Sequence, residues 1–102
     1  MKPFRLTRKE ILKDPREAAE YLNTVFEEGD PAMFMVALRN VAEAHGGLLD
    51  ISKKTKLNRG NLYRIFSEKG NPGIQNLETL LEALGLKLQV GILKEPRMKR
   101  AA

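Results

Sequence analysis

Residues 58–67 carry side chains whose types and spacing suit hydrogen bonding to nucleic acid. With Leu62 placed on the buried side of a helix, the outward side holds Gly60, Asn61, Tyr63 and Arg64. Arginine donates two hydrogen bonds to guanine and asparagine pairs with adenine, whereas a tyrosine hydroxyl reaches a phosphate. A glycine in the first turn would let the helix come close to a nucleic-acid backbone. This outward set therefore predicts a helix that enters the DNA major groove.

Positive charge gathers around the same helix. Residues 46–102 carry eleven basic and five acidic residues, a net charge of +6, whereas residues 1–45 carry seven and eight, a net charge of −1. Lysines beside a groove bind phosphates and raise affinity without reading sequence. A solvated surface would show the same charge, so charge alone leaves both interpretations open. The residues expected to contact double-stranded operator DNA are Lys53, Lys54, Lys56, Asn58, Arg59, Gly60, Asn61, Tyr63, Arg64 and Ser67.

The composition excludes several other classes of function. The 102 residues fit one domain, and a chain without cysteine forms neither disulfides nor thiolate metal sites. His45, Ser52 and Ser67 lie in no nucleophile motif, and the loop Gly70–Gly73 lacks the strand and the Lys-Ser/Thr of a phosphate-binding loop. No apolar run approaches the roughly 18 residues of a membrane span, and the N-terminus has no apolar signal core. We expect a cytoplasmic protein that is not an enzyme, with no cofactor, no metal and no membrane contact.

Five helices are expected to position the outward set. Asp14-Pro15 and Asp30-Pro31 each place an N-capping aspartate before a proline that suits the first helical turn. The expected helices cover about 15–28, 31–45, 48–55, 59–66 and 74–84, with a turn at 56–58. Their apolar stripes are Ala18, Leu22, Val25 and Phe26; Phe34, Ala37, Leu38 and Val41; Leu48, Leu49, Ile51 and Ser52; Leu62, Ile65 and Phe66; and Ile74, Leu77, Leu81 and Leu84.

After Gly85 the apolar period changes to two, which predicts a half-buried β-strand over 86–93. A lone strand has unpaired backbone groups, so it would pair with a second copy of the chain or with another protein. Alternatively its apolar side packs on the helices, and the sequence leaves both open. The predicted organisation is an N-terminal tail at 1–13, one helix-turn-helix domain at 14–93 with its motif at 48–67, and a basic tail at 94–102.

This chain resembles the lambda-repressor-like (XRE) helix-turn-helix family over the stretch LLDISKKTKLNRGNLYRIFSEKGNPGIQNLETLLEALGLKL. More narrowly, residues 14–88 resemble the HigA-type addiction-module antitoxins, also called probable prophage antidote proteins, through YLNTVFEEGDPAMFMVALRNVAEAHG, TKLNRGNLYRIFSEKGNPG and LLEALGLKL. Two positions depart from the family: Lys56 stands where the turn usually has Gly, and Ser52 stands where the preceding helix has Ala. A left-handed Lys56 would be strained. The resemblance implies an all-α, five-helix lambda-repressor-like DNA-binding domain with a C-terminal β-strand.

The same resemblance implies an antitoxin of a type II toxin–antitoxin module, which neutralises a basic RelE/ParE-like toxin and represses its own operon. A basic partner needs an acidic or apolar surface, and residues 15–45 carry six acidic residues against two basic ones. That acidity would also serve solubility alone. Two-fold DNA recognition further predicts a homodimer. The alternatives are a stand-alone prophage-type transcriptional repressor and a protein-interaction module without DNA affinity. The residues expected to bind the toxin are Glu17, Glu20, Glu27 and Glu28.

Overall fold

Six helices and no strand make up the part of the chain that the computed structural model describes, residues 7–67 and 72–94. The all-helical class is confirmed, with six helices in place of the five expected. Most of the expected N-terminal and C-terminal tails (1–6 and 95–102) and of the Gly/Pro loop (68–71) lies outside the described residues. The helices are α1 (Arg8–Leu12), α2 (Pro15–Glu27), α3 (Pro31–Ala44), α4 (Gly47–Lys54), α5 (Arg59–Ile65) and α6 (Ile74–Ala83).

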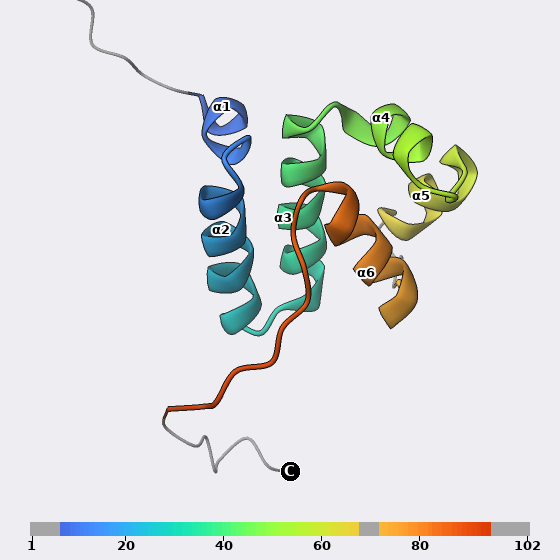
Figure 1. Cartoon of the computed structure of the whole chain (residues 1–102). Helices are drawn as coiled ribbons and strands as arrows, with labels where there is room; N and C mark the ends of the chain where they lie inside the picture. The colour runs from blue at the N-terminus through green and yellow to red at the C-terminus, as the bar shows by residue number, and fades with distance from the viewer. Residues whose placement is uncertain (1–6, 68–71, 95–102) are drawn as a thin grey trace, which may run out of the picture.

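The helices form two groups that share α3. α2 and α3 run antiparallel side by side, and α1 sits at the N-terminal end of α2 (Figure 1). On the other side of α3, α4 packs against α3, α5 and α6. α2 and α5 therefore lie on opposite sides of the molecule, with α3 between them (Figure 1).

The two Asp-Pro signals begin helices as predicted. The Asp14 side chain accepts a hydrogen bond from the Arg16 backbone N–H at 2.9 Å, and Asp30 accepts one from the Ala32 N–H at 3.0 Å. A proline occupies the first turn of both helices. Each aspartate satisfies an N–H group that the helix itself leaves unpaired, a contribution of about 1 kcal/mol.

The additional helix, α1, lies in a stretch that the sequence analysis placed in the N-terminal tail. It begins with a capping box, in which the Glu10 N–H donates to Thr7 Oγ1 at 3.1 Å and the Thr7 N–H donates to Glu10 Oε1 at 2.9 Å. Leu12 is 3% exposed, and its carbonyl oxygen lies 3.2 Å from His45 Nε2 at the end of α3. One buried side chain and one hydrogen bond thus attach α1 to the body.

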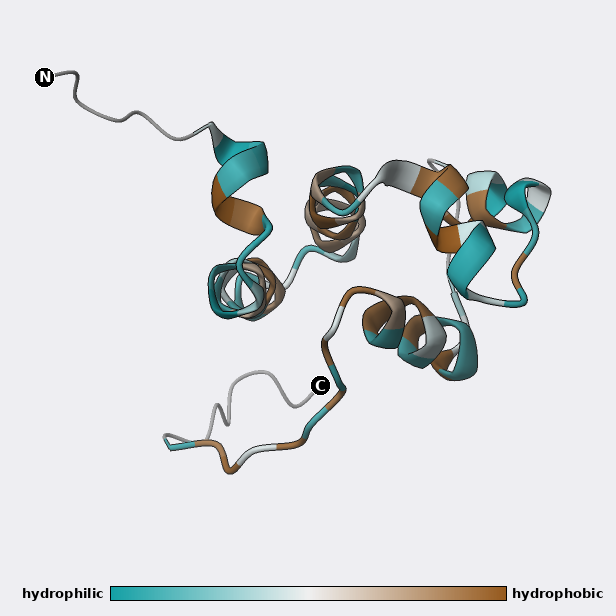
Figure 2. Cartoon of the chain, turned by 45° about the horizontal axis from the view of Figure 1, so that its top comes forward, coloured by the Kyte–Doolittle hydropathy of each residue, from teal (hydrophilic) through white to brown (hydrophobic). Residues whose placement is uncertain are grey.

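A single apolar core joins both groups of helices. Figure 2 shows apolar residues in every helix and again along the C-terminal segment. Most predicted core positions are buried, but Phe26, Leu49 and Ile74 are 68%, 49% and 75% exposed. Phe26 and Ile74 lie at helix ends. Leu49 is rotated by about 100° from Leu48 around the helix axis, so α4 buries Leu48 and Ile51 and leaves Leu49 in solvent. The buried residues are Leu12, Ala18, Leu22, Ala37, Leu38, Val41, Ala42, Ala44, Leu48, Ile51, Leu62, Ile65, Phe66, Leu80, Leu81 and Leu84.

Two consecutive glycines turn the chain from α3 into α4. Gly46 and Gly47 have φ angles of 103° and 81°, a conformation that side chains disfavour. A Cβ atom at Gly46 would also lie only 2.7 Å from the Cβ of Asp50. The direction in which α4 leaves α3 therefore depends on glycine at residue 46.

The C-terminal segment forms no strand within residues 86–94. Gly85, with φ at 81°, ends α6, and the Leu86 N–H donates to the Leu81 carbonyl at 2.8 Å. Leu86 packs against the core, whereas Val90 and Ile92 are 97% and 95% exposed. The predicted strand is therefore not present within the described residues of the single chain, and its apolar side is left in solvent at Val90 and Ile92. No described helix is long and apolar enough to cross a membrane.

Candidate nucleic-acid interface

α4, the turn after it and α5 form a compact unit in which a threonine closes the turn. Thr55 Oγ1 donates to the Ile51 carbonyl at 2.9 Å and accepts from the Leu57 N–H at 3.1 Å. Thr55 itself is extended, with φ at −128°. No non-glycine residue in the described ranges has a positive φ, so the strain expected at Lys56 does not arise. The hydroxyl of Thr55 makes the turn without the usual glycine.

α5 begins at Asn58, whose side-chain oxygen accepts a hydrogen bond from the Asn61 N–H at 2.7 Å. Leu62 is fully buried, and Ile65 is 5% exposed. The buried side of α5 is therefore the predicted one. Of the outward set, Gly60, Tyr63 and Arg64 are exposed and Asn61 is half-buried.

The glycine and the serine of the expected interface have simple surroundings. A Cβ atom at Gly60 would meet Asn58 Oδ1 at an ordinary 3.4 Å, so packing within the chain does not require glycine there. Ser67 is exposed and its hydroxyl donates to the Arg64 carbonyl at 2.7 Å, at the C-terminal end of α5. The departure at Ser52 is accommodated, because its hydroxyl donates to the Leu49 carbonyl at 3.0 Å.

Arg64 and Asn61 are joined on the outward side of α5. Arg64 Nη2 donates to Asn61 Oδ1 at 2.7 Å, one helical turn apart. A sequence wheel places the two residues near each other but does not predict this bond. The two side chains that were expected to read bases independently are therefore connected.

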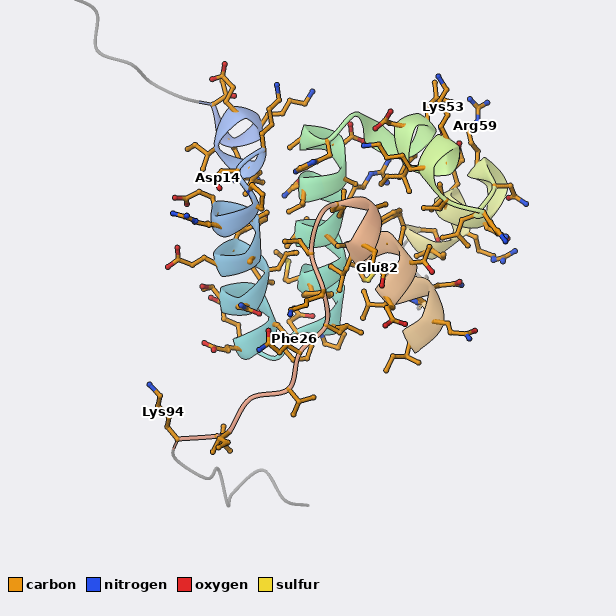
Figure 3. All side chains as sticks on the ribbon, in the orientation of Figure 1. Asp14, Phe26, Lys53, Arg59, Glu82 and Lys94 are labelled. Atoms are coloured by element: carbon orange, nitrogen blue, oxygen red, sulfur yellow. The ribbon has the colours of Figure 1, made fainter. Side chains whose placement is uncertain are left out.

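The basic residues around α5 divide into two kinds. Lys54 forms an exposed ion pair with Asp50 at 3.0 Å, one turn back on α4. Within the described residues, Lys53, Lys56 and Arg59 form no ion pair. Lys53 and Arg59 come from different helices and project from the same edge of the molecule (Figure 3). Such unneutralised cations beside an outward helix suit phosphate binding.

α2 lies on the opposite side of the molecule from α5 (Figure 1), and it carries most of the expected acidic residues. Glu17, Glu20, Glu27 and Glu28 are all exposed. At about 100° per residue they fall on one side of α2, away from the buried Leu22. A shallow groove runs beside Glu17 and Glu20, with its other side formed by Arg8, Ile11 and Leu12 of α1.

An aromatic pair joins the adjoining ends of α2 and α3. Phe26 is 68% exposed, whereas Phe34 is half-buried and packs against the core, as expected. Phe26 and Phe34 meet edge to face, with ring centroids 5.4 Å apart and ring planes at 72°. Within the described residues, no group of three or more His, Cys, Asp or Glu is placed to hold a metal ion.

Comparison with known proteins gives one family. The model of the family described as "probable addiction module antidote protein" matches residues 2–92. The match spans all six helices as well as most of the C-terminal segment. No curated protein and no solved structure matches the chain.

Proposed function

The chain belongs to the family of probable addiction module antidote proteins, and we propose that it is a HigA-type antitoxin that binds operator DNA through α4 and α5. An antidote is not an enzyme, and its partner is a toxin. In this proposal the toxin is RelE/ParE-like, the module is of type II, and the antitoxin represses its own operon. The helix-turn-helix would be of the lambda-repressor-like (XRE) kind.

One observation carries the proposal for DNA. The outward side of α5 presents Arg64 and Tyr63, while Lys53 and Arg59 project from the adjoining edge without an acidic partner among the described residues. Proteins that read the major groove combine side chains that contact base edges with cations that contact phosphates. Arg64 could serve the first role, and Lys53 and Arg59 the second. Asn58, Gly60, Asn61 and Ser67 complete the proposed contact from α5, and Lys54 and Lys56 complete it from α4 and the turn.

The proposed toxin surface is the acidic side of α2. Glu17 and Glu20 rim the groove between α1 and α2, so an apolar side chain of a basic partner would find apolar contact and opposite charge together. Glu27 and Glu28 extend the acidic side toward the Phe26 end of α2. Because α2 and α5 lie on opposite sides of α3, toxin and DNA would be bound at the same time.

The proposed assembly is a homodimer that pairs residues 86–93 of two copies. One α5 helix covers one half-site, and a two-fold operator needs two copies. Val90 and Ile92 stand two residues apart and are almost fully exposed, and pairing would cover them. The cost of leaving two β-branched side chains in water favours a partner for this segment.

A binding titration tests the DNA proposal. Full-length protein is titrated into labelled DNA from upstream of its own gene, and into a shuffled fragment of the same length, at several salt concentrations. We expect the upstream fragment to bind about a thousandfold or more tightly at physiological salt. Affinity for both should fall as salt rises. Equal affinity for both fragments would contradict operator binding and favour a protein-interaction module.

A co-purification test addresses the toxin. The reading frame beside this gene is inspected for a small basic RelE/ParE-like protein, which is then co-expressed with the tagged chain. A stable complex and rescue of growth support the antitoxin role. A chain that binds its own upstream DNA, yet has no such neighbour and rescues nothing, would instead be a stand-alone repressor.

A further inference from the structure

The hydrogen bond between Arg64 and Asn61 constrains how α5 can read DNA. Arginine has only donors, so the Asn61 amide atom that lies 2.7 Å from Arg64 Nη2 must be the oxygen. The distance is at the short end for a hydrogen bond from a charged donor, as expected of a charge-assisted bond. Asn61 therefore presents its carbonyl to Arg64 and its NH₂ group to the other side.

The two residues differ in how freely they can move. The backbone of Asn61 is tied to Asn58 Oδ1 at 2.7 Å, and its side chain is half-buried. Arg64 is exposed and longer, so its guanidinium reaches farther from the helix axis. Asn61 is thus the anchored partner and Arg64 the extended one.

We infer that Asn61 is a positioning residue, which orients the Arg64 guanidinium toward a guanine. The two side chains then read one base pair together, whereas independent reading would use two base pairs. This inference rests on the proposed binding of DNA by α5. One of the five N–H donors of Arg64 is spent on Asn61, and four remain for guanine O6 and N7. Because Asn61 already restricts the Arg64 guanidinium in the free protein, less side-chain conformational entropy is lost when Arg64 binds a base.

Independent reading of an adenine by Asn61 would need a different arrangement. A bidentate pair with adenine turns both the amide oxygen and the amide NH₂ toward the base. In the structure the oxygen is turned toward Arg64. Swinging it to an adenine would break the short bond and leave Arg64 without its orienting partner. The geometry thus favours one shared base pair.

Selection from random-sequence DNA separates the two arrangements by position. The wild type and the variants Arg64→Ala, Asn61→Ala and Asn61→Asp are each used to enrich binding sites, and base preference is scored at every position. Arg64→Ala should reduce preference for one guanine by about 5- to 150-fold. Asn61→Ala should weaken preference for that same guanine and alter no other position. A fourth variant that combines Arg64→Ala with Asn61→Ala should match Arg64→Ala alone.

Asn61→Asp is the conservative rescue. A carboxylate accepts from arginine but cannot donate, so the guanine preference should return while affinity for all sequences falls, because a negative charge now faces the phosphates. Unchanged thermal unfolding of each variant shows that the fold is intact, since neither side chain belongs to the core.

Two results would overturn the inference. The first is loss of an adenine preference at a separate position in Asn61→Ala, with the guanine preference unaltered, because Asn61 would then be a base reader. The second is failure of Asn61→Asp to restore the guanine preference. If the wild type and every variant fail to enrich any site, the proposed DNA binding by α5 is wrong and the inference falls with it. That outcome differs from the two above, in which the wild type still enriches a site.

Discussion

Leu62 decides which side chains of α5 face outward. It is fully buried and Ile65, almost one turn on, is nearly so, which leaves Tyr63 and Arg64 on the solvent side. This much is predictable from sequence, because apolar residues at i, i+3 and i+4 allow only one buried side of a helix. The hydrogen bond from Arg64 to Asn61 is not predictable in this way, since it depends on the rotamers of an exposed and a half-buried side chain.

Arg64 and Lys53 should differ in what they contribute to DNA binding. Arg64→Ala should lower the discrimination between operator and random DNA by about 1–3 kcal/mol, because it removes a bidentate base contact. Lys53→Ala should weaken both complexes about equally and flatten the salt dependence by about one counterion, because it removes a phosphate contact. Titration of both DNAs across a salt series measures the two effects. Operator binding that survives Arg64→Ala together with Asn61→Ala would exclude α5 as the reader.

Truncation of a side chain on α6 should cost much more stability in the core than on the surface. Leu80 is fully buried, so Leu80→Ala should lower the free energy of unfolding by about 2–5 kcal/mol through lost burial and a residual cavity. Ile74 is on the same helix but 75% exposed, and Ile74→Ala should change stability by less than about 0.5 kcal/mol. Urea unfolding followed by circular dichroism measures both. A large loss for Ile74→Ala would place that residue in an interface.

Among the elements, a capping signal is most useful to sequence reasoning where a long apolar period follows it. Asp14 and Asp30 begin α2 and α3 as predicted. The capping box at Thr7 and Glu10 was an equally readable signal for α1, but five residues are too few to show an apolar period, so the stretch was interpreted as a tail. The turn before α5 is expected to strain Lys56, but no described non-glycine residue has a positive φ. Local hydrogen bonds of the Thr55 hydroxyl close the turn instead.

The acidic side of α2 should be needed for the toxin and not for DNA. Glu17 and Glu20 are exposed, so Glu17→Lys with Glu20→Lys reverses charge beside the groove and spares the core. Affinity for the toxin should fall and become less sensitive to salt, while folding and operator binding persist. Affinity measurement and growth rescue on co-expression give the result.

A matched control lies on α6, where Glu78 and Glu82 are also exposed. Glu78→Lys with Glu82→Lys changes the net charge by the same amount on a different helix, so a specific α2 surface predicts that this variant keeps its toxin affinity. Rescue by the α2 variant that equals the parent, with unchanged affinity, would mean that the toxin binds elsewhere.

At the scale of the whole molecule, the C-terminal segment is the part whose structure the sequence of one chain does not predict. The period-two pattern of residues 86–93 was read as a strand, but strand hydrogen bonds need a second strand, which the described residues do not supply. Val90 and Ile92 remain in solvent as a result. The alternating sequence pattern therefore does not form a strand within the described residues, and pairing with a second copy belongs to the proposed assembly.

Association should depend on the apolar side of that segment. If it pairs two copies, Val90→Lys should shift the dimer toward monomer, whereas Gln89→Lys, on the alternate side of an extended chain, should shift it less. Light scattering at micromolar concentration measures both, free and on operator DNA. Finding only monomer in both conditions would rule out the dimer. A dimer that survives truncation after Gly85 would remove only the role of residues 86–93.

The positions of the two tyrosines have a spectroscopic consequence. The chain has no tryptophan, so its intrinsic emission arises from Tyr21 and Tyr63. Tyr21 accepts a hydrogen bond from Asn40 Nδ2 at 2.9 Å and lines the groove beside Glu17, whereas Tyr63 is 56% exposed on α5. Each proposed surface therefore contains one intrinsic fluorophore, so binding can be followed without attaching a label. In Tyr21→Phe the remaining emission reports on α5, and in Tyr63→Phe it reports on α2, so parallel titrations of the two variants follow the two proposed surfaces separately.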